Sequence, residues 1–257
     1  MAIHLTAVVD PSAKVPKSCT IGPLCVIGAN VELGENCELI SHVAVHGPTR
    51  IGNNNRIFPF ASIGSEPQDT SYKGDPTQLE IGSNNVIREY VTINRGTNKG
   101  GGITRVGNFT LIMAYSHIGH DCQVGDHAML VNGATLAGHV SVGEWAVVGA
   151  MSAVHQFTRV GAHSYIGGGT IIVQDVLPYS LTSAKRDAKA YGINKIGLQR
   201  RGFSDERLQV LHRAFRTLTA SKMNTSQAIE KLKAEEQTDD LRHLLEFIEQ
   251  SQRGFVK

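Results

Sequence analysis

The 257-residue sequence is poor in aromatic residues, in cysteine and in net charge, and it has no long apolar run. Aromatic residues make up 6% of the chain and hydrophobic residues 41%, so a core must be built mainly from aliphatic side chains. Because no run of about 18 apolar residues occurs, we expect no membrane-spanning segment. The first residues, as far as Pro11, have neither the basic segment nor the apolar stretch of a signal peptide.

The net charge is only +2, but it is distributed unevenly. Residues 1–184 carry 10 Lys and Arg against 13 Asp and Glu, a balance of −3, whereas residues 185–257 carry 15 against 10, a balance of +5. A basic end on a mildly acidic body predicts an anionic ligand or an acidic partner protein there. An ordinary solvated surface explains the same charges equally well. No nucleic-acid partner is expected.

Aliphatic residues recur at every sixth position through most of the sequence. One series begins at Ile3 and continues in phase to Ile93, and a second, shifted by one residue, runs from Val106 to Ile172. Glycine often follows the aliphatic residue, and a small or β-branched residue stands four places after it. A period of six fits neither a helix nor a simple amphipathic strand, and it is typical of the hexapeptide repeat.

Each hexad predicts one short strand and its turn, so three hexads close a triangular coil of about 18 residues. The aliphatic residue and the small residue four places on both point inward, and successive coils rise by about 4.8 Å. Roughly nine or ten coils give a prism on the order of 45 Å long. We therefore predict an all-β left-handed parallel β-helix, in which glycine supplies the unusual backbone angles of the corners.

The four cysteines all fall on the small inward position of a hexad: Cys19, Cys25, Cys37 and Cys122. We interpret them as buried, reduced thiols that act as small hydrophobic residues, not as disulfide partners or metal ligands. This usage fits a reducing, cytoplasmic location.

Two segments interrupt the hexads and are predicted to leave the coil as loops. Residues 65–80 keep the phase without the aliphatic signal, and residues 98–105 shift the phase by one. The hexads end near Val176. The predicted organisation is a β-helix over residues 1–184 and a helical C-terminal domain over residues 185–257, which covers one end of the prism.

Three helices are predicted in the C-terminal domain. Ser204 has the character of an N-cap, because an acidic first turn and then apolar residues at helical spacing follow it. A second helix is expected at about residues 226–235 and a third at about residues 239–252.

Histidines gather in one stretch of the predicted prism, at His117, His120, His139 and His155. With about 18 residues in a coil, His120, the Gly138-His139 pair and the His155-Gln156 pair are expected to stack about 5 Å apart in successive coils. None of the four histidines stands at an inward position. A column of imidazoles on the outside of a rigid prism predicts proton transfer or metal binding.

Six segments resemble the UDP-N-acetylglucosamine acyltransferase family: Ile63–Thr77, Thr92–Thr97, His117–Cys122, Leu136–Val140, Val154–Phe157 and Gly197–Phe203. The resemblance covers essentially the whole chain. It implies the first step of lipid A biosynthesis, in which a 3-hydroxyacyl group passes from the phosphopantetheine of acyl carrier protein to the glucosamine 3-hydroxyl of UDP-N-acetylglucosamine. It also implies a homotrimer with its sites in the clefts between neighbouring prisms, and no metal or other cofactor.

The resemblance implies catalytic roles for three residues. His120 matches the general base, which removes the proton of the sugar hydroxyl during attack on the thioester. Asp121 would orient or polarise His120. The backbone N–H of Gly138 matches the donor to the developing oxyanion, and a glycine there would let the thioester approach closely.

The resemblance also implies binding roles. Gln68 and Asp69, on the first loop, match positions that contact the sugar and the hydroxyacyl group. Gly168 falls where the family measures acyl length, and a glycine there favours a longer chain. The nucleotide-binding positions are matched by Asn194, Arg200 and Arg201, where guanidinium groups suit a pyrophosphate. The other residues implied to bind substrate are Asn94, His117, His139, His155 and Gln156.

The sequence departs from the family pattern at three places. Asn94 stands where histidine is usual, which leaves open a 3-amino sugar as the acceptor and an amide as the product. Ser71 replaces a lysine of the first loop, and Lys73 lies two residues on. Ile196 replaces a glutamate near the uracil position, and residues 184–187 replace a Gly-Asn turn.

Two hypotheses of another class remain open at this point. A zinc-dependent hydratase, like the hexapeptide-fold carbonic anhydrases, would use His117, His120 and His139 in a cleft shared between subunits. An inactive β-helical scaffold would only assemble partners, although the concentration of polar residues on one stretch of coils argues against it.

Overall fold

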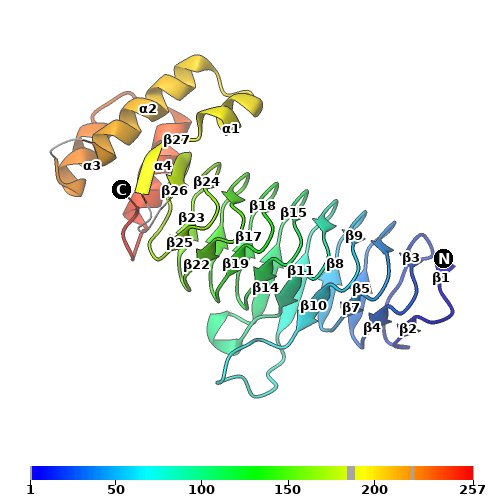
Figure 1. The fold of residues 1–257 in the computed structure, drawn as a ribbon. Coiled ribbons are helices and arrows are strands. Elements are labelled where there is room, and N and C mark those ends of the chain that lie inside the picture. Colours follow the sequence, from blue (N-terminus) through cyan, green and yellow to red (C-terminus); the bar gives the residue numbers. More distant parts are fainter. Residues whose placement is uncertain (1, 184–188, 221–222, 257) are drawn as a thin grey trace.

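The structure is a computed structural model, and it describes residues 2–183, 189–220 and 223–256. Most of the chain winds into a straight triangular prism with three parallel sheets, and helices lie at the C-terminal end (Figure 1). This is the predicted left-handed parallel β-helix with a C-terminal helical part. In the part of the chain that the structure describes, no helix combines the length and the apolar character needed to cross a bilayer.

We name the sheets A, B and C in the order in which each coil visits them. Sheet A contains β1 (Ala2–Ile3), β3 (Thr20–Ile21), β6 (Glu38–Leu39), β9 (Arg56–Ile57), β12 (Val86–Ile87), β15 (Leu111–Ile112), β18 (Met129–Leu130), β21 (Val147–Val148), β24 (Tyr165–Ile166), β26 (Ser180–Ser183) and β27 (Lys189–Ile193). Sheet B contains β2 (Val8–Val9), β4 (Val26–Ile27), β7 (Ala44–Val45), β10 (Ser62–Ser65), β13 (Thr92–Asn94), β16 (His117–Ile118), β19 (Thr135–Leu136), β22 (Ala153–Val154) and β25 (Ile171–Ile172). Sheet C contains β5 (Val31–Leu33), β8 (Thr49–Ile51), β11 (Gln78–Ile81), β14 (Ile103–Val106), β17 (Gln123–Val124), β20 (Ser141–Val142) and β23 (Arg159–Val160).

The hexad pattern sets both the core and the register. The aliphatic residue of each strand points inward, and residues such as Ile118 and Leu136 are fully buried. These two are paired between β16 and β19, 18 residues apart as the sequence predicts. The cysteines are buried free thiols, also as predicted.

Glycine has a different place in the coils from the one predicted. The left-handed corner positions are held mainly by larger residues, among them Asn30, Phe60 and Trp145. Several hexad glycines instead lie where coils come closest: a β-carbon on Gly22 would be 1.7 Å from the backbone oxygen of Ile40. Glycine is therefore needed there for the close approach of two backbones and not for its φ angle.

Two loops leave the prism where the chain passes from sheet B to sheet C, and they are the projections below the prism in Figure 1. The first is shorter than predicted, and the second has the predicted length but lies three residues earlier in the chain. The first spans residues 66–77, because Ser65 still belongs to β10 and Gln78 begins β11. The second spans residues 95–102, because buried Ile103 begins β14 and pairs with β11. The two loops lie side by side at one corner.

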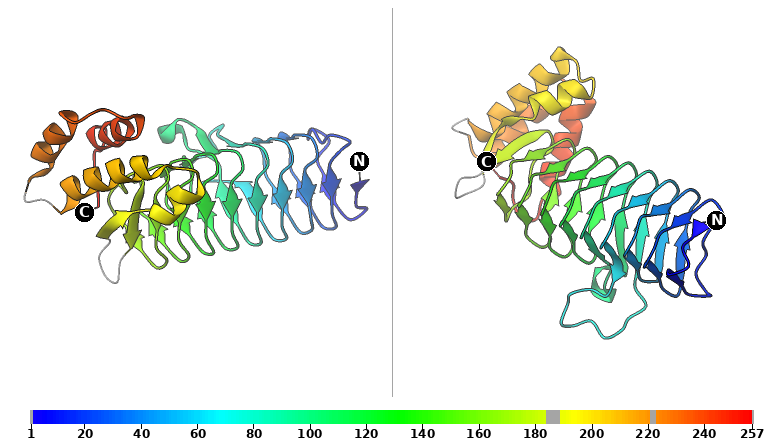
Figure 2. Two further views of the ribbon diagram at one scale, coloured as in Figure 1. Left: turned by 90° about the horizontal axis from the view of Figure 1, so that it is seen from above. Right: turned by 45° about the vertical axis from the view of Figure 1, so that its right-hand side comes forward.

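The C-terminal part contains α1 (Lys195–Arg200), α2 (Asp205–Thr219), α3 (Thr225–Lys233) and α4 (Asp239–Glu249) (Figures 1 and 2). The last three confirm the predicted helices, and Ser204 caps α2 as expected. The antiparallel pairing of β26 with β27 and the short α1 were not predicted. The predicted boundary between residues 184 and 185, and the departure at residues 184–187, lie outside the described residues.

Candidate functional site

The candidate active site lies at the corner between sheets B and C. His120 and Asp121 follow β16, and Cys122 precedes β17. The alternation of the hexad buries the Cys122 side chain completely and leaves the His120 side chain 15% exposed. Asp121 occupies the corner itself with a φ of +62°, a conformation that aspartate tolerates better than most residues.

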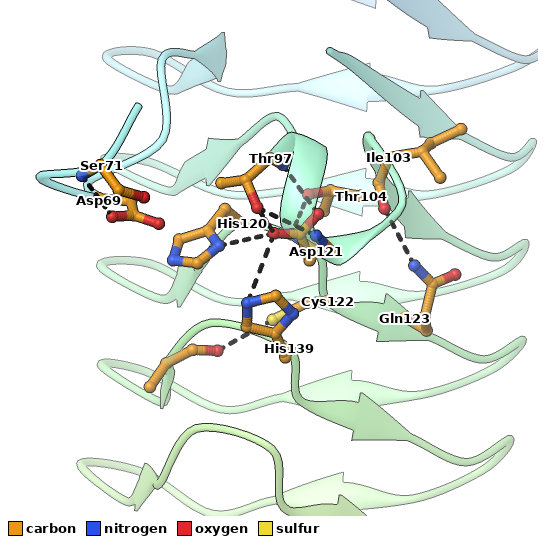
Figure 3. Close-up of polar contacts among 12 residues, drawn as sticks. Asp69, Ser71, Thr97, Ile103, Thr104, His120, Asp121, Cys122, Gln123 and His139 are labelled. Atoms are coloured by element: carbon orange, nitrogen blue, oxygen red, sulfur yellow. Dashed lines mark hydrogen bonds and ion pairs between the residues drawn. The ribbon is translucent and has the colours of Figure 1, made fainter. Parts of the chain in front are cut away.

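A short hydrogen bond joins His120 to Asp121 (Figure 3). Nδ1 of His120 lies 2.8 Å from Oδ2 of Asp121, whose side chain is 1% exposed. An ionised carboxylate can only accept hydrogen bonds, so this contact assigns the hydrogen to Nδ1. Nε2 is then left with its lone pair, which is the form that a general base needs.

Asp121 is itself held by the second loop. The backbone N–H of Thr97 donates to Oδ1 of Asp121 at 2.8 Å, and the Thr97 hydroxyl donates to Oδ2 at 2.7 Å. The Asp121 N–H donates to the Thr104 hydroxyl at 2.7 Å, and a β-carbon on Gly100 would be 2.1 Å from the Asp121 carboxyl carbon. The sequence predicts no role for Thr97, Gly100 or Thr104, and the Thr92–Thr97 segment was its only signal.

Gly138 lies one coil beyond His120 in the same register. A β-carbon on Gly138 would be 2.5 Å from Cε1 and 2.6 Å from Nε2 of His120, so the imidazole fills the place of a side chain. The first group that this glycine accommodates is therefore the His120 ring and not the thioester. Among the described residues the Gly138 N–H makes no backbone hydrogen bond, which leaves it available as a donor to an oxyanion.

Two further histidines lie beside His120. The His139 ring meets the His120 ring edge-on at 5.0 Å, and its Nε2 lies 3.7 Å from Oδ2 of Asp121. Nδ1 of His117 lies 2.7 Å from the Thr92 hydroxyl. Burial, followed by the charge of His120, lowers the pKa of His117. Burial also lowers the pKa of His139, although Asp121 opposes this. Both rings are thus kept neutral near neutral pH, as hydrogen-bonding groups for a substrate.

His120 and His139 lie in successive coils with ring centres 5.0 Å apart, as predicted, but they stand in neighbouring registers. His120, Gly138 and Gln156 share one register, and His155 stands one residue before it. Asp121, His139 and Phe157 share the other, and the rings of His139 and Phe157 stack at 4.3 Å. The predicted column of imidazoles is therefore not continuous, because Phe157 and not a histidine stacks on His139. His155 and Gln156 are exposed at the far end of the site.

The first loop brings Asp69 towards His120, as Figure 3 shows, with exposed Gln68 next to it. Hydrogen bonds from Ser71 lower the pKa of Asp69, and the charges of His120 and Lys99 lower it further. Ser71 acts here through its backbone N–H, 2.7 Å from Oδ1 of Asp69, so the turn does not require a lysine at this position.

Asn94 and Arg95 anchor the base of the first loop. The Asn94 side chain is almost fully buried and donates to the backbone oxygen of Glu66 at 2.8 Å. Arg95 donates to the Gly64 carbonyl at 3.0 Å and to the Tyr72 hydroxyl at 2.9 Å. The Asn94 amide oxygen has no partner among the described residues. Asn94 therefore positions the loop, and its amide oxygen remains available to accept a hydrogen bond.

The predicted nucleotide-binding residues lie at a different corner, between sheets C and A. The Arg201 guanidinium lies over the ring of Trp145, 5.2 Å from its centre, and burial lowers the pKa of Arg201. Asn194 caps α1 and donates to the His163 carbonyl at 3.0 Å. Arg200 is exposed. One chain therefore does not bring these residues together with His120.

Aromatic rings support this second corner in a way that the sequence did not predict. Trp145 stacks on His127 at 3.9 Å and on His163 at 6.4 Å, and His163 stacks on Tyr179 at 5.6 Å. His127, Trp145 and His163 follow one another at intervals of 18 residues, so the hexad period could have predicted that their rings stack. Ile196, at the departure near the uracil position, is exposed in the first turn of α1.

Gly168 lies at the third corner, between β24 of sheet A and β25 of sheet B. A β-carbon there would be 3.1 Å from the backbone oxygen of Ala150. The predicted acyl-length position is thus not brought next to His120 within a single chain.

One group of side chains in the described residues could hold a metal ion. Ligand atoms of His120, Asp121 and His139 lie within 4.8 Å of one another. His117, the third histidine of the predicted zinc set, does not belong to this group. The Oδ2 of Asp121 in addition already accepts hydrogen bonds from His120 and Thr97, as a carboxylate that orients a base does.

Comparison with known proteins adds to this geometry. The protein-family model described as "Udp N-acetylglucosamine O-acyltransferase; Domain 2" matches residues 175–256, and the bacterial transferase hexapeptide model matches residues 103–138. The acyl-[acyl-carrier-protein]–UDP-N-acetylglucosamine O-acyltransferase of Thermodesulfovibrio yellowstonii is 49% identical over 99% of both chains. The protein of the same name from Xylella fastidiosa is 46% identical over 99% of this chain and 97% of that protein.

Solved structures agree along the whole length. The enzyme of this kind from Acinetobacter baumannii superimposes with a TM-score of 0.96 at 43% identity, with full coverage of both chains. The UDP-N-acetylglucosamine acyltransferase from Bacteroides fragilis gives a TM-score of 0.97 at 39% identity, over 99% of this chain and 100% of that one.

Proposed function

The chain belongs to the UDP-N-acetylglucosamine O-acyltransferase family, and we propose that its B–C corner carries out the reaction with His120 as the general base. The protein is an acyltransferase that moves a 3-hydroxyacyl group from acyl carrier protein to the 3-hydroxyl of UDP-N-acetylglucosamine, the first step of lipid A biosynthesis. The observation that carries the mechanism is the 2.8 Å contact between His120 and a buried carboxylate.

The proposed reaction follows from this contact. Nε2 of His120 takes the proton of the sugar hydroxyl as the oxygen attacks the thioester carbonyl. The Gly138 N–H donates to the carbonyl oxygen as it becomes negative. When the tetrahedral intermediate collapses, the C–S bond breaks and the leaving thiolate takes the proton back from Nε2. Asp121 stabilises the imidazolium between these two steps through Nδ1.

A homotrimer supplies the rest of the site in this proposal. The base lies at the B–C corner, the arginines lie at the C–A corner, and Gly168 lies at the A–B corner. A groove runs over sheet C between the first two corners, lined along its length by charged residues from Glu32 to Arg159. If a neighbouring prism packs beside this face, its C–A corner meets the B–C corner of the first chain, and each cleft contains both sets of residues.

The basic C-terminal part, with its balance of +5, is the end proposed to receive the acidic acyl carrier protein. The reaction requires no cofactor besides the phosphopantetheine of the donor. The four buried thiols support a reducing, cytoplasmic location.

Mass spectrometry of the products tests the proposal. The protein is incubated with 3-hydroxyacyl carrier protein and either UDP-N-acetylglucosamine or its 3-amino analogue, with and without prior removal of metals by a chelator. We expect an ester product from the first sugar, unchanged by the chelator. Product from the amino sugar alone would change the reaction to amide formation, and loss of activity that zinc restores would favour the hydratase-like use of His120 and His139.

A further inference from the structure

The C-terminal tail brings an arginine, Arg253, next to His155. The Asp175 N–H donates to the Gly254 carbonyl at 3.0 Å, and the Val256 N–H donates to the Asp175 carbonyl at 2.8 Å. The buried Asp175 carboxylate also accepts a hydrogen bond from the Ser251 hydroxyl at 2.8 Å. These bonds lie on both sides of Arg253 in the sequence, so they hold the backbone of this residue against the prism.

Arg253 stands at the end of the column that begins at Asp121. The His139 ring stacks on Phe157, and the Arg253 guanidinium lies 5.9 Å from the centre of the Phe157 ring. Its Nη1 is 3.5 Å from Nδ1 of His155. Within the described part of the chain no carboxylate forms an ion pair with this guanidinium. An exposed guanidinium so placed is suited to a phosphate group of a substrate.

The distance from His120 distinguishes the phosphates of the two substrates. The rings of His120 and His139 are 5.0 Å apart, those of His139 and Phe157 are 4.3 Å apart, and the guanidinium lies 5.9 Å further. Taken together, these steps place the guanidinium no more than about 15 Å from the His120 ring. The coil spacing gives a similar value, two to three coils or about 10–14 Å.

The two substrates differ in the distance between the reacting atom and the nearest phosphorus atoms. In the acceptor, about five to seven bonds separate the sugar 3-oxygen from the two phosphorus atoms, a reach of roughly 6–8 Å at ordinary bond geometry. In the donor, about thirteen bonds separate the thioester sulfur from the phosphorus of phosphopantetheine, a reach of roughly 15 Å. The donor phosphate fits the separation between His120 and Arg253.

We propose that Arg253 binds the phosphate of the donor's phosphopantetheine arm, so that the arm extends along His139 and Phe157 from the thioester to the C-terminal tail. This inference rests on the proposed function, since it assumes that the thioester reacts at His120. It assigns a donor-binding role to a residue that makes no contact with the base.

Small donors test this role without carrier-protein docking. Transfer to UDP-N-acetylglucosamine is measured from 3-hydroxyacyl-phosphopantetheine and from 3-hydroxyacyl-pantetheine, which lacks the phosphate. The wild type is expected to use the phosphorylated donor about tenfold better in kcat/KM, because a charge-assisted hydrogen bond is lost with the phosphate. In Arg253→Gln this preference disappears, while the rate with the unphosphorylated donor and the KM for the acceptor stay unchanged. Arg253→Lys keeps part of the preference.

Arg213→Gln, an exposed arginine of α2 without a part in the column, serves as the matched control and keeps the full preference. A phosphate preference that survives in Arg253→Gln overturns the inference. A higher KM for the acceptor with an unchanged donor preference also overturns it, because the arginine would then bind the pyrophosphate. If the wild type transfers from neither donor nor from acyl carrier protein, the proposed function itself has failed.

Discussion

The ring of His120 lies against the backbone of Gly138, in the space that a side chain at position 138 would occupy. This contact and the hydrogen bond to Asp121 fix the imidazole on two sides. The base is thus positioned by one residue next to it in the sequence and by another one full coil away.

The replacement Gly138→Ala is expected to displace His120. The new methyl carbon would lie 2.5 Å from Cε1 of the ring, so the ring must turn away from the substrate. A misplacement of about 1 Å can cost roughly a hundredfold in rate, and we expect a loss of that order in kcat. The thermal midpoint changes little, since the ring can move outward. Gly192→Ala is the control, because beyond its two chain neighbours no atom of the described residues lies within 4 Å of the added carbon there.

Asp121→Asn tests the orientation of the base. The amide cannot accept from His120 and from both donors of Thr97 at once, so the Nδ1 hydrogen is no longer fixed. We expect kcat to fall at least tenfold with a smaller change in KM, measured under saturating donor. The matched control is Asp126→Asn, since Asp126 accepts from the Asn108 N–H at the C–A corner. Equal losses in both variants would refute a specific role for Asp121.

Asn94→Ala tests the anchor of the first loop. Loss of the hydrogen bond to the Glu66 carbonyl loosens the loop that carries Gln68 and Asp69. With about 1 kcal/mol for such a bond, we expect the KM for the acceptor to rise about fivefold and kcat to change less. Asn132→Ala, at an exposed asparagine, provides the reference. A fall in kcat at constant KM would place Asn94 in the chemical step instead.

The stability of the protein is expected to fall in mild acid because of His163. Burial, and then the charge of Arg201, lowers the pKa of His163 to about 4 from an ordinary 6.5. The unfolded chain therefore binds this proton more readily than the folded one does. The contribution of His163 to the free energy of unfolding is therefore constant above about pH 6.5. It decreases by up to about 3 kcal/mol between about pH 6.5 and 4, and it is constant again below that.

Thermal unfolding of the wild type and of His163→Phe measures this contribution. Phenylalanine keeps a ring between Trp145 and Tyr179 but does not titrate. The midpoint of the variant should fall less than that of the wild type between pH 6.5 and 4. Parallel decreases in the two proteins would show that other groups cause the acid effect.

The period of the sequence predicted the coils because every strand buries one aliphatic residue at a fixed interval. The same interval placed Gly138 next to His120. It could not place Thr97, because the second loop interrupts the period and its path depends on contacts such as that of Gly100 with Asp121. The antiparallel pairing of β26 with β27 was missed for a similar reason, since both strands follow the last hexad.

The corners show a second limit. A hexad defines which residues point inward, but it does not define which way a residue with positive φ sends its side chain. The prediction therefore did not separate the register of His120 from that of His139, which stacks on Phe157. The position of Arg253 could not be predicted from the sequence, because the C-terminal tail pairs with a part of the prism that is distant in the chain.

The turnover of His120→Ala tests the central claim most directly. The transfer of the 3-hydroxyacyl group to UDP-N-acetylglucosamine is followed by mass spectrometry, and circular dichroism and gel filtration compare the fold and the assembly with those of the wild type. His120 lies outside the aliphatic core of the prism, so the variant should stay folded. The account predicts that kcat falls by at least a hundredfold. A folded variant with near-normal turnover would contradict the assignment of His120 as the general base.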